Sequence, residues 1–193
     1  MKKIICICLA FLLIFSLAAC KGKEVADEPN DANVYDLNEC MKQGKIPEIK
    51  YTLGTNPETI KKDFEGVTEQ NGEEVELYIN ENPNSTNISV ANNYYYYVNG
   101  SEDKGISSIL SFDTAFGIEV NGFDTKEDIK RKFTTVEFTE RQLTSLQAYF
   151  IPGEVENCSA LTCKTENRRI DFIFMDETLI AINLVDTENW TLT

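Results

Sequence analysis

Hydrophobic and polar residues alternate along much of the chain, which is the pattern of half-buried β-strands. Successive side chains of a strand point to opposite faces, so residues two positions apart share a face. The alternation is clearest at Val75/Leu77/Ile79, Ile170/Phe172/Phe174 and Ile180/Ile182/Leu184. Turn-forming residues separate the predicted strands, and the connections are too short for parallel crossovers. The pattern therefore predicts an antiparallel sheet.

Two short amphipathic helices are predicted ahead of these strands. TNPETIKKDF (residues 55–64) matches DTKEDIKRKF (residues 124–133) without a gap. Thr55 and Asp124 are each followed three positions later by a glutamate, which is the arrangement of a helix capping box. In both segments an isoleucine and a phenylalanine lie four residues apart, on one helical face. We therefore predict two helices that begin at Thr55 and Asp124.

The similarity of the two segments continues into the strands and indicates an internal duplication. We predict an α+β fold of two tandem repeats, each a helix packed on a roughly four-stranded antiparallel sheet. The predicted strands lie near residues 75–80, 94–99, 107–113, 116–120, 146–151, 159–164, 169–175 and 179–185. Residues 80–87 are polar and are expected to form a longer loop in the first copy. The alternative is that any two amphipathic α+β units could look this similar.

In each repeat the helix is expected to cover one face of the sheet. We expect the opposite face to stay solvated, as is common for antiparallel sheets. The first repeat is assigned to residues 34–120 and the second to residues 121–193. A further short helix is predicted near residues 34–43, because Gly44 follows its apolar positions.

The N-terminus has the layout of a secretory signal peptide, assigned to residues 1–19. Two lysines precede a charge-free run over residues 4–19, which is shorter than the ~20 apolar residues of a membrane-spanning helix. The run ends in LAAC (residues 17–20), which resembles the lipobox of bacterial lipoproteins. That resemblance implies cleavage before Cys20, a diacylglycerol on its sulfur, and anchoring at the extracytoplasmic face of the cell membrane. A plain secreted protein is the alternative. Residues 20–33 are polar and are predicted to be a flexible tether.

The helix entries LGTNPETIKKDF and NGFDTKEDIKRKF, each followed by a meander of strands, support a second resemblance. In tandem they resemble the β-lactamase-inhibitory-protein and small outer-membrane lipoprotein superfamily, called BLIP-like. The resemblance covers about residues 51–185. In that family a sheet surface is presented to another protein, so the resemblance implies a protein-binding module.

Composition narrows the chemistry that this chain can carry. It has 32 acidic and 18 basic residues, a net charge of −14, which disfavours nucleic acid as a partner. The chain has no histidine, which excludes Ser-His-Asp and Cys-His catalysis. We assign no catalytic residue and expect no metal or cofactor. A small cell-envelope enzyme that uses carboxylates and an envelope assembly factor remain alternative functions.

Three cysteines follow the predicted lipidation site, namely Cys40, Cys158 and Cys163. An odd number leaves at least one thiol unpaired. If Cys158 and Cys163 lie on one strand, they are separated by ~16 Å. A disulfide requires Cα atoms within about 7 Å. The three thiols also lack the paired spacing of a zinc site.

The run NNYYYYVNG (residues 92–100) supplies the candidate binding residues. On a strand, Val98 shares its face with Tyr94 and Tyr96, which predicts that this set points towards the helix. Tyr95 and Tyr97 would then lie on the open face, where tyrosines give large contact areas. We predict that Tyr95 and Tyr97 bind an unknown protein or cell-envelope ligand. The alternative is that tyrosine is present because it favours strands.

Overall fold

The computed structural model describes residues 35–67, 69–70, 73–74, 76–82, 85–90, 94–99, 104–144 and 157–190. The predicted signal peptide, the tether and Cys20 lie outside these residues. Both predicted repeats fall within one compact unit, Asn33–Thr193. Among the residues described, no helix has the length and apolar character needed to cross a membrane.

The chain folds into one large antiparallel sheet with helices on one face. The helices are α2 (Leu37–Gln43), α3 (Pro57–Asp63) and α4 (Lys126–Lys132). The sheet strands are β3 (Leu77–Asn82), β4 (Ser85–Val90), β5 (Tyr94–Asn99), β6 (Ser108–Ser111), β9 (Thr139–Gln142), β10 (Cys158–Lys164), β11 (Arg168–Met175) and β12 (Thr178–Asp186). Two small hairpins pair β1 (Glu69–Gln70) with β2 (Glu73–Glu74), and β7 (Thr114–Ala115) with β8 (Ile118–Glu119). The predicted α+β class and antiparallel sheet are confirmed.

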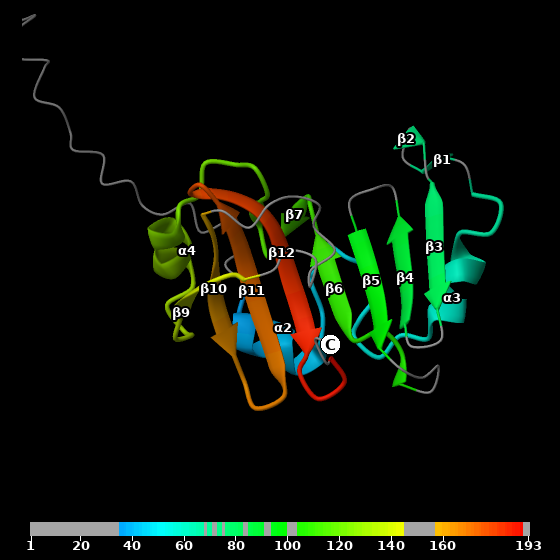
Figure 1. Cartoon of the computed structure of the whole chain (residues 1–193), viewed down its shortest axis with the longest axis horizontal. Coiled ribbons are helices and arrows are strands. Elements are labelled where there is room, and N and C mark those ends of the chain that lie inside the picture. The colour runs from blue at the N-terminus through cyan, green and yellow to red at the C-terminus, as the bar shows by residue number, and fades with distance from the viewer. Residues whose placement is uncertain are drawn as a thin grey trace, which may run out of the picture. The chain divides into compact units, whose positions relative to one another are not determined.

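Two four-stranded meanders join at the centre of this sheet. The strand order is β3-β4-β5-β6-β12-β11-β10-β9, so β6 pairs with β12 although they are far apart in sequence (Figure 1). Figure 1 also shows α3 near β3, α4 near β9, and α2 behind the sheet, where it contacts β11. The sequence did not determine whether the halves share a sheet, and the structure shows that they do.

Two predictions about the first half are wrong. Residues 80–87, predicted as a loop, belong mostly to β3 and β4, which form a hairpin. Residues 116–120, predicted as a strand of the main sheet, instead belong to the separate β7–β8 hairpin and the residues next to it. Backbone hydrogen bonds hold a ladder together whatever the side chains are. A polar stretch can therefore be a strand that a search for apolar alternation does not find.

The helix starts differ by one residue from those predicted. The N-cap of α3 is Asn56 rather than Thr55. The side chain of Asn56 accepts a hydrogen bond from the backbone amide of Glu58 at 2.9 Å. The N-cap of α4 is Thr125 rather than Asp124, and it forms a capping box with Asp128. Asparagine and threonine are good N-caps, and a proline follows at the first helical position of α3. Local sequence predicted the caps but not their exact positions.

The main core lies between the helices and the sheet face that they cover. Each of the three described helices contributes a buried side chain, namely Met41, Ile60 and Ile129, each 0% exposed. Phe172 of β11 packs against Phe116, Phe133 and Phe138, with ring centroids 6.1 to 6.4 Å apart. Such tilted and edge-on contacts add stability beyond area burial.

The β7–β8 hairpin is held to this core by a carboxylate. Glu48 Oε2 accepts a hydrogen bond from the backbone amide of Phe116 at 2.9 Å, and Oε1 accepts one from the backbone amide of Gly117 at 2.6 Å. Both turn residues have positive φ, 55° and 67°. Lys132 of α4 donates to the Gly117 carbonyl at 2.7 Å. The turn is therefore fixed from two distant parts of the chain.

We expect Glu48→Gln to lower the free energy of unfolding by about 1–2 kcal/mol. The substituted amide can accept at only one oxygen, so one of the two backbone amides loses its acceptor. Urea denaturation at pH 7 measures the effect. Glu166→Gln makes the same charge change in the exposed turn after β10 and should be close to neutral. Equal effects of the two variants would contradict this role of Glu48.

Candidate functional site

The sheet face opposite the helices carries a buried polar cluster, not the solvated surface that we predicted. Asp171 alternates along β11 with the core residues Ile170 and Phe172, so it points to this second face. Asp171 is 0% exposed and Asn183 of β12 is 1% exposed. A charged side chain is buried this deeply only when it is paired.

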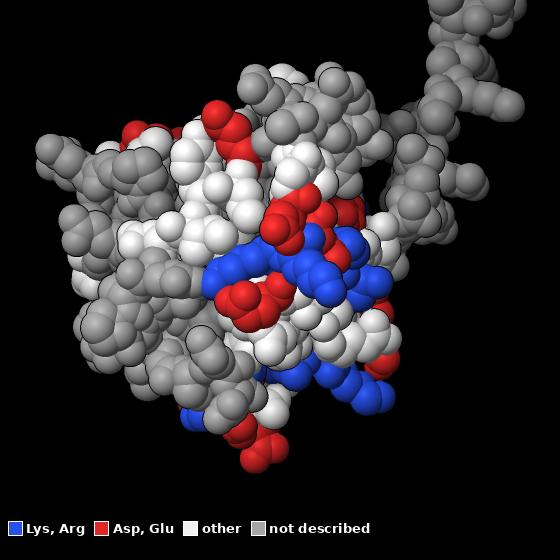
Figure 2. Space-filling view, turned by 90° about the vertical axis from the view of Figure 1, so that its right-hand side faces the viewer, with Lys and Arg blue, Asp and Glu red and all other residues white. Residues whose placement is uncertain are grey.

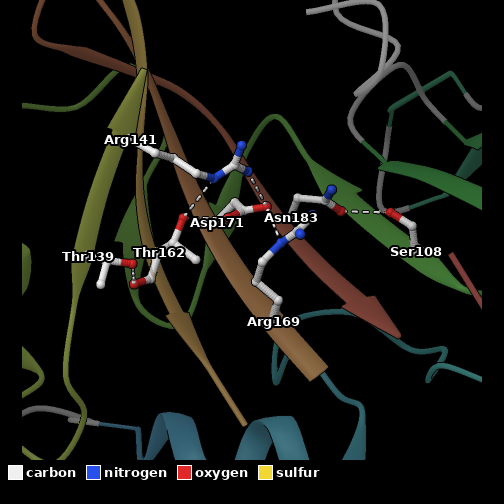
Figure 3. Close-up of polar contacts among 7 residues, drawn as sticks. All are labelled: Ser108, Thr139, Arg141, Thr162, Arg169, Asp171 and Asn183. Carbon is white, nitrogen blue, oxygen red and sulfur yellow. Dashed lines mark hydrogen bonds and ion pairs between the residues drawn. The ribbon is translucent and has the colours of Figure 1, made fainter. Parts of the chain in front are cut away.

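Four residues from three neighbouring strands form the centre of the Asp171 cluster (Figure 3). Asp171 Oδ2 accepts from Arg169 Nε at 2.7 Å and from Arg141 Nη2 at 3.2 Å. Its other oxygen, Oδ1, accepts from the Thr162 hydroxyl at 2.7 Å. Arg141 Nε also donates to that hydroxyl, at 3.4 Å. Both oxygens of the buried carboxylate therefore have hydrogen-bond donors.

The cluster continues across the sheet through Asn183. Its Oδ1 accepts from the Ser108 hydroxyl on β6 at 2.7 Å. Two buried donors, Asn183 Nδ2 and Arg169 Nη2, have no hydrogen-bond partner in the structure as described. Buried polar atoms are nearly always paired, so these two donors are exceptions to the rule.

Among the described residues, the Asp171 cluster contains two guanidinium groups and one carboxylate, and the whole chain has a net charge of −14. Arg141 and Asp171 also make further contacts. The side chains of Arg141 and Arg169 are 39% and 20% exposed, whereas that of Asp171 is 0% exposed. The cluster thus presents guanidinium to solvent. Arginine stays protonated, so this arrangement suits recognition of an acceptor rather than proton transfer.

The end of the molecule near β3 and α3 has a different charge distribution. Figure 2 shows basic and acidic side chains next to one another on this face. Lys61 pairs with Glu58 and Lys50 pairs with Asp63, both at 2.6 Å. The hydrogen bond from Lys50 lowers the pKa of Asp63. Each of these two ion pairs joins a basic and an acidic side chain at this end of the molecule.

The backbone register relates the Asp171 cluster to the predicted binding residues. Directly opposed residues form a row across the sheet that contains Tyr78, Tyr95, Leu110, Asn183, Asp171 and Thr162. The next row contains Tyr97, Ser108, Val185 and Arg169. The side chains of Tyr95 and Tyr97 lie outside the described part of the structure. Tyr78, which the sequence analysis did not select, is 53% exposed.

Sequence reasoning did not find the Asp171 cluster. Arg169 and Asp171 alternate with apolar residues in the sequence, but the same alternation is expected when the polar residues face water. The arginine that completes the ion pairs, Arg141, comes from a different strand, β9. Only the pairing of β9, β10 and β11 brings these side chains together.

Cys158 and Cys163 both lie on β10, which is the case in which the strand spacing separates them too far for a disulfide. These two and Cys40 are buried and are not joined in disulfides. Burial, with a smaller contribution from the Asp171 charge, raises the pKa of Cys163 to about 12. Burial and the nearby acidic groups, Asp36 first, raise the pKa of Cys40 to about 11. Neither thiol forms the reactive thiolate at neutral pH.

We expect alkaline pH to destabilise the fold through these thiols. Between the ordinary value of 9.0 and about 12, Cys163 ionises in the unfolded chain but stays protonated in the folded one. Its contribution to stability is therefore complete below pH 9 and is lost as the pH rises towards 12. Melting temperatures from pH 8 to pH 11 should fall more steeply for wild type than for Cys163→Ala. Parallel curves would contradict this assignment.

A polar cleft of about 440 Å³ lies beside the β9 edge of the sheet. Lys126 of α4 lines it and pairs with Glu140 and, at 3.7 Å, with Glu177. The Lys126 ammonium lowers the pKa of Glu140, which is the opposite of what a general acid requires. In the part of the chain that the structure describes, no group of three or more His, Cys, Asp or Glu residues could hold a metal ion.

No protein-family model matches the chain, and no curated protein matches it. A solved structure that is similar is the DUF4309 family protein YjgB from Bacillus subtilis. The two share 18% sequence identity with a TM-score of 0.46, over 80% of this chain and 95% of YjgB.

Proposed function

We propose that this chain is a lipid-anchored, extracytoplasmic interaction module that binds a protein or another cell-envelope ligand on the second face of its sheet. One observation supports this proposal above the others. The register places Tyr95 in the row of Asn183 and Asp171, and Tyr97 in the row of Arg169.

The two rows carry residue types of a protein-binding surface at β5 and β11, tyrosine and arginine, whereas residues between them such as Leu110 and Asn183 are buried. Tyrosine and arginine are the residues on which binding energy is most often concentrated. From β5 to β11 the rows cross three strand spacings, which is about 14 Å at ~4.8 Å per spacing. A patch of this width fits within a standard interface of about 800 Å² per partner. A sheet also holds such residues rigidly, which limits the entropy lost on binding.

The predicted anchor fits this role. Two acyl chains on Cys20 would give stable membrane attachment, because each buried methylene contributes about 0.8 kcal/mol. A flexible tether over residues 20–33 would span roughly 20 Å between the lipid and the folded unit. The interaction surface could then reach partners close to the membrane.

The tandem-repeat origin also belongs to this proposal. Helix α3 precedes the meander β3–β6, and α4 precedes the meander β9–β12. The two meanders meet through their last strands, β6 and β12. In the amino-acid sequence, in contrast, residues 95–113 resemble residues 158–176, which matches β6 with β11. If the two meanders are copies of one unit, their strands correspond by order, so that β6 corresponds to β12. The sequence match is displaced from this correspondence by one strand.

Affinity capture tests the proposed function. A soluble form beginning at Glu24 is immobilised and exposed to envelope and secreted proteins of its own organism. We expect a protein that wild type retains and that Tyr95→Ala/Tyr97→Ala releases. Phe123→Ala is the matched control, because Phe123 is a fully exposed aromatic residue that precedes α4. Circular dichroism checks that each variant is folded.

The other outcomes are equally informative. Retention of the same protein by both wild type and the tyrosine variant would place the surface elsewhere. Loss of the captured protein in Phe123→Ala would assign the binding surface to the region before α4. A wild-type column that retains no protein would contradict a protein partner.

A further inference from the structure

We propose that the polar cleft beside the β9 edge binds an amino sugar, that is, a primary ammonium group carried on a hydroxylated body. The cleft has a volume of about 440 Å³ and lies where α4 approaches β9 (Figure 1). It is separate from the surface of the proposed function, which is the second face of the sheet. The inference goes beyond that function and does not depend on it.

The strand register places the cleft on the helix-covered face of the sheet. Gln142 of β9, Ser159 of β10 and Phe174 of β11 are directly opposed, so their side chains share one face. Phe174 belongs to the main core, and the ammonium of Lys126 lies 5.5 Å from the centroid of its ring. Gln142 and Ser159 therefore face the same space as Lys126.

A buried hydroxyl indicates that this space receives a ligand. Ser159 is 3% exposed and lines the cleft. Within the described part of the chain, its hydroxyl has no hydrogen-bond partner. Buried polar side chains are nearly always paired. The Ser159 hydroxyl is therefore available to a group that enters the cleft.

The described residues that line the cleft carry more negative than positive charge. Glu140, Asp176 and Glu177 contribute three carboxylates, and Lys126 contributes one ammonium. Lys126 pairs with Glu140 and, at 3.7 Å, with Glu177. Among these residues, Asp176 is left without a cation. A cleft lined mainly by one sign of charge attracts a ligand of the opposite sign, which here is a cation.

The neighbouring bases do not offset this excess of negative charge. The charge of Lys130 acts on Glu140, but Lys130 is itself paired with Glu127 at 2.6 Å. Residues 143–156, which connect β9 to Asn157, contain two glutamates and no lysine or arginine. The charge that favours a cation is therefore a property of the cleft.

The lining also selects the body that carries the positive charge. Every described residue of the lining is polar or charged, so an alkyl chain would find no apolar surface there. Hydroxyl groups, in contrast, can bond to Ser159 and to the side-chain amides of Gln142 and Asn157. The volume exceeds many times the ~30 Å³ of a water molecule, which leaves room for a sugar ring. A divalent metal ion is disfavoured, because the Lys126 ammonium already lies among the carboxylates.

Titration of the full-length chain in a mild detergent with glucosamine tests the proposal. At pH 6 the sugar amine is protonated, because this pH lies below the ordinary pKa of an amine. The readouts, at constant ionic strength, are the NMR resonances of the side-chain NH₂ groups of Gln142 and Asn157. We expect both to shift and to saturate. N-acetylglucosamine keeps the hydroxyls but lacks the charge, and it should bind about tenfold more weakly. Butylamine has the charge but lacks the hydroxyls, and it should bind about fivefold more weakly.

Two variants assign the binding to the cleft. Asp176→Asn removes the carboxylate that has no cation, and asparagine tolerates the positive φ of 47° at this turn position. We expect the glucosamine affinity to fall about fivefold. Ser159→Ala removes the unpaired hydroxyl and should weaken binding about threefold. Glu166→Gln is the matched control, because it makes the same charge change in the exposed turn after β10 and should leave the affinity unchanged.

Four results would overturn the inference. Shifts that rise linearly without saturation would mean that glucosamine has no site. Equal affinities for glucosamine and N-acetylglucosamine would mean that the charge is not recognised, and equal affinities for glucosamine and butylamine would exclude the hydroxylated body. Unchanged affinity in both Asp176→Asn and Ser159→Ala would place the site elsewhere. If one of these variants fails to fold, the other decides.

The glucosamine titration and the capture experiment fail separately, because they test opposite faces of the sheet. Glucosamine binding without a captured protein would support the cleft and contradict the protein partner. A captured protein that depends on Tyr95 and Tyr97, without glucosamine binding, would support the interaction surface and contradict the cleft.

Discussion

Replacing Asp171 by asparagine is expected to lower the free energy of unfolding by about 3 kcal/mol or more. Asp171 is 0% exposed and accepts from Arg169, Arg141 and Thr162. Removing one partner of a buried ion pair leaves the other charge uncompensated, which typically costs about 3–5 kcal/mol. The partial exposure of both guanidinium groups places the effect near the lower end. Urea denaturation at pH 7 measures the change.

Asp113→Asn is the control for the charge change alone. Asp113 is exposed in the turn after β6, and its substitution should change stability by less than about 0.5 kcal/mol. If the two variants were equally stable, the Asp171 carboxylate would not be the group that holds the two arginines. A double-mutant cycle with Arg169→Gln then measures the coupling between Arg169 and Asp171 directly.

Gly105→Ala is expected to destabilise the fold by about 3 kcal/mol, for a different reason. Gly105 has a φ of +68°, and a Cβ atom there would lie 2.2 Å from the carbonyl oxygen of Gly54. Hydrogen bonds hold the two segments together on either side, Gly54 N to Ile106 O at 2.8 Å and Ile106 N to Thr55 O at 2.9 Å. The backbones can separate only if these bonds break. Backbone strain costs about 1–3 kcal/mol, and each lost bond costs about 1 kcal/mol.

Gly66→Ala separates the two contributions to this effect. Gly66 also has a positive φ, +74°, but a Cβ atom there would meet nothing within 4 Å. We expect this variant to lose only about 1 kcal/mol, the conformational contribution. Thermal or urea unfolding of both variants gives the difference, which measures the contact with Gly54. A difference near zero would show that the residue 54–55 segment moves away freely from Gly105.

Three strands of the second half were predicted well because their side chains alternate clearly. The strand predicted near residues 146–151 lies outside the described residues, and β9 was not predicted. Strands near residues 159–164, 169–175 and 179–185 were expected, and β10, β11 and β12 agree within one residue at each end. The first half was predicted less well. Its β3–β4 hairpin is polar at the turn, so apolar alternation stops before the strands do.

The candidate site was predictable only in part. The register places Tyr95 and Tyr97 on backbone positions in line with the Asp171 cluster, but the cluster itself was not foreseen. A charged residue on a strand looks the same in sequence whether it faces water or a buried partner. The difference depends on Arg141, which reaches Asp171 from another strand.

The sequence alone determined the class of fold, the approximate helices and most strands, since these follow from local periodicity and capping. It also indicated that Cys158 and Cys163 would be too far apart to pair if they shared a strand, and the structure shows that they share β10. Only the tertiary structure decided that β6 pairs with β12 and that the second face buries a charge. Both depend on contacts between residues far apart in the chain. Their energies come from cross-strand pairing and the removal of water, which no local pattern records.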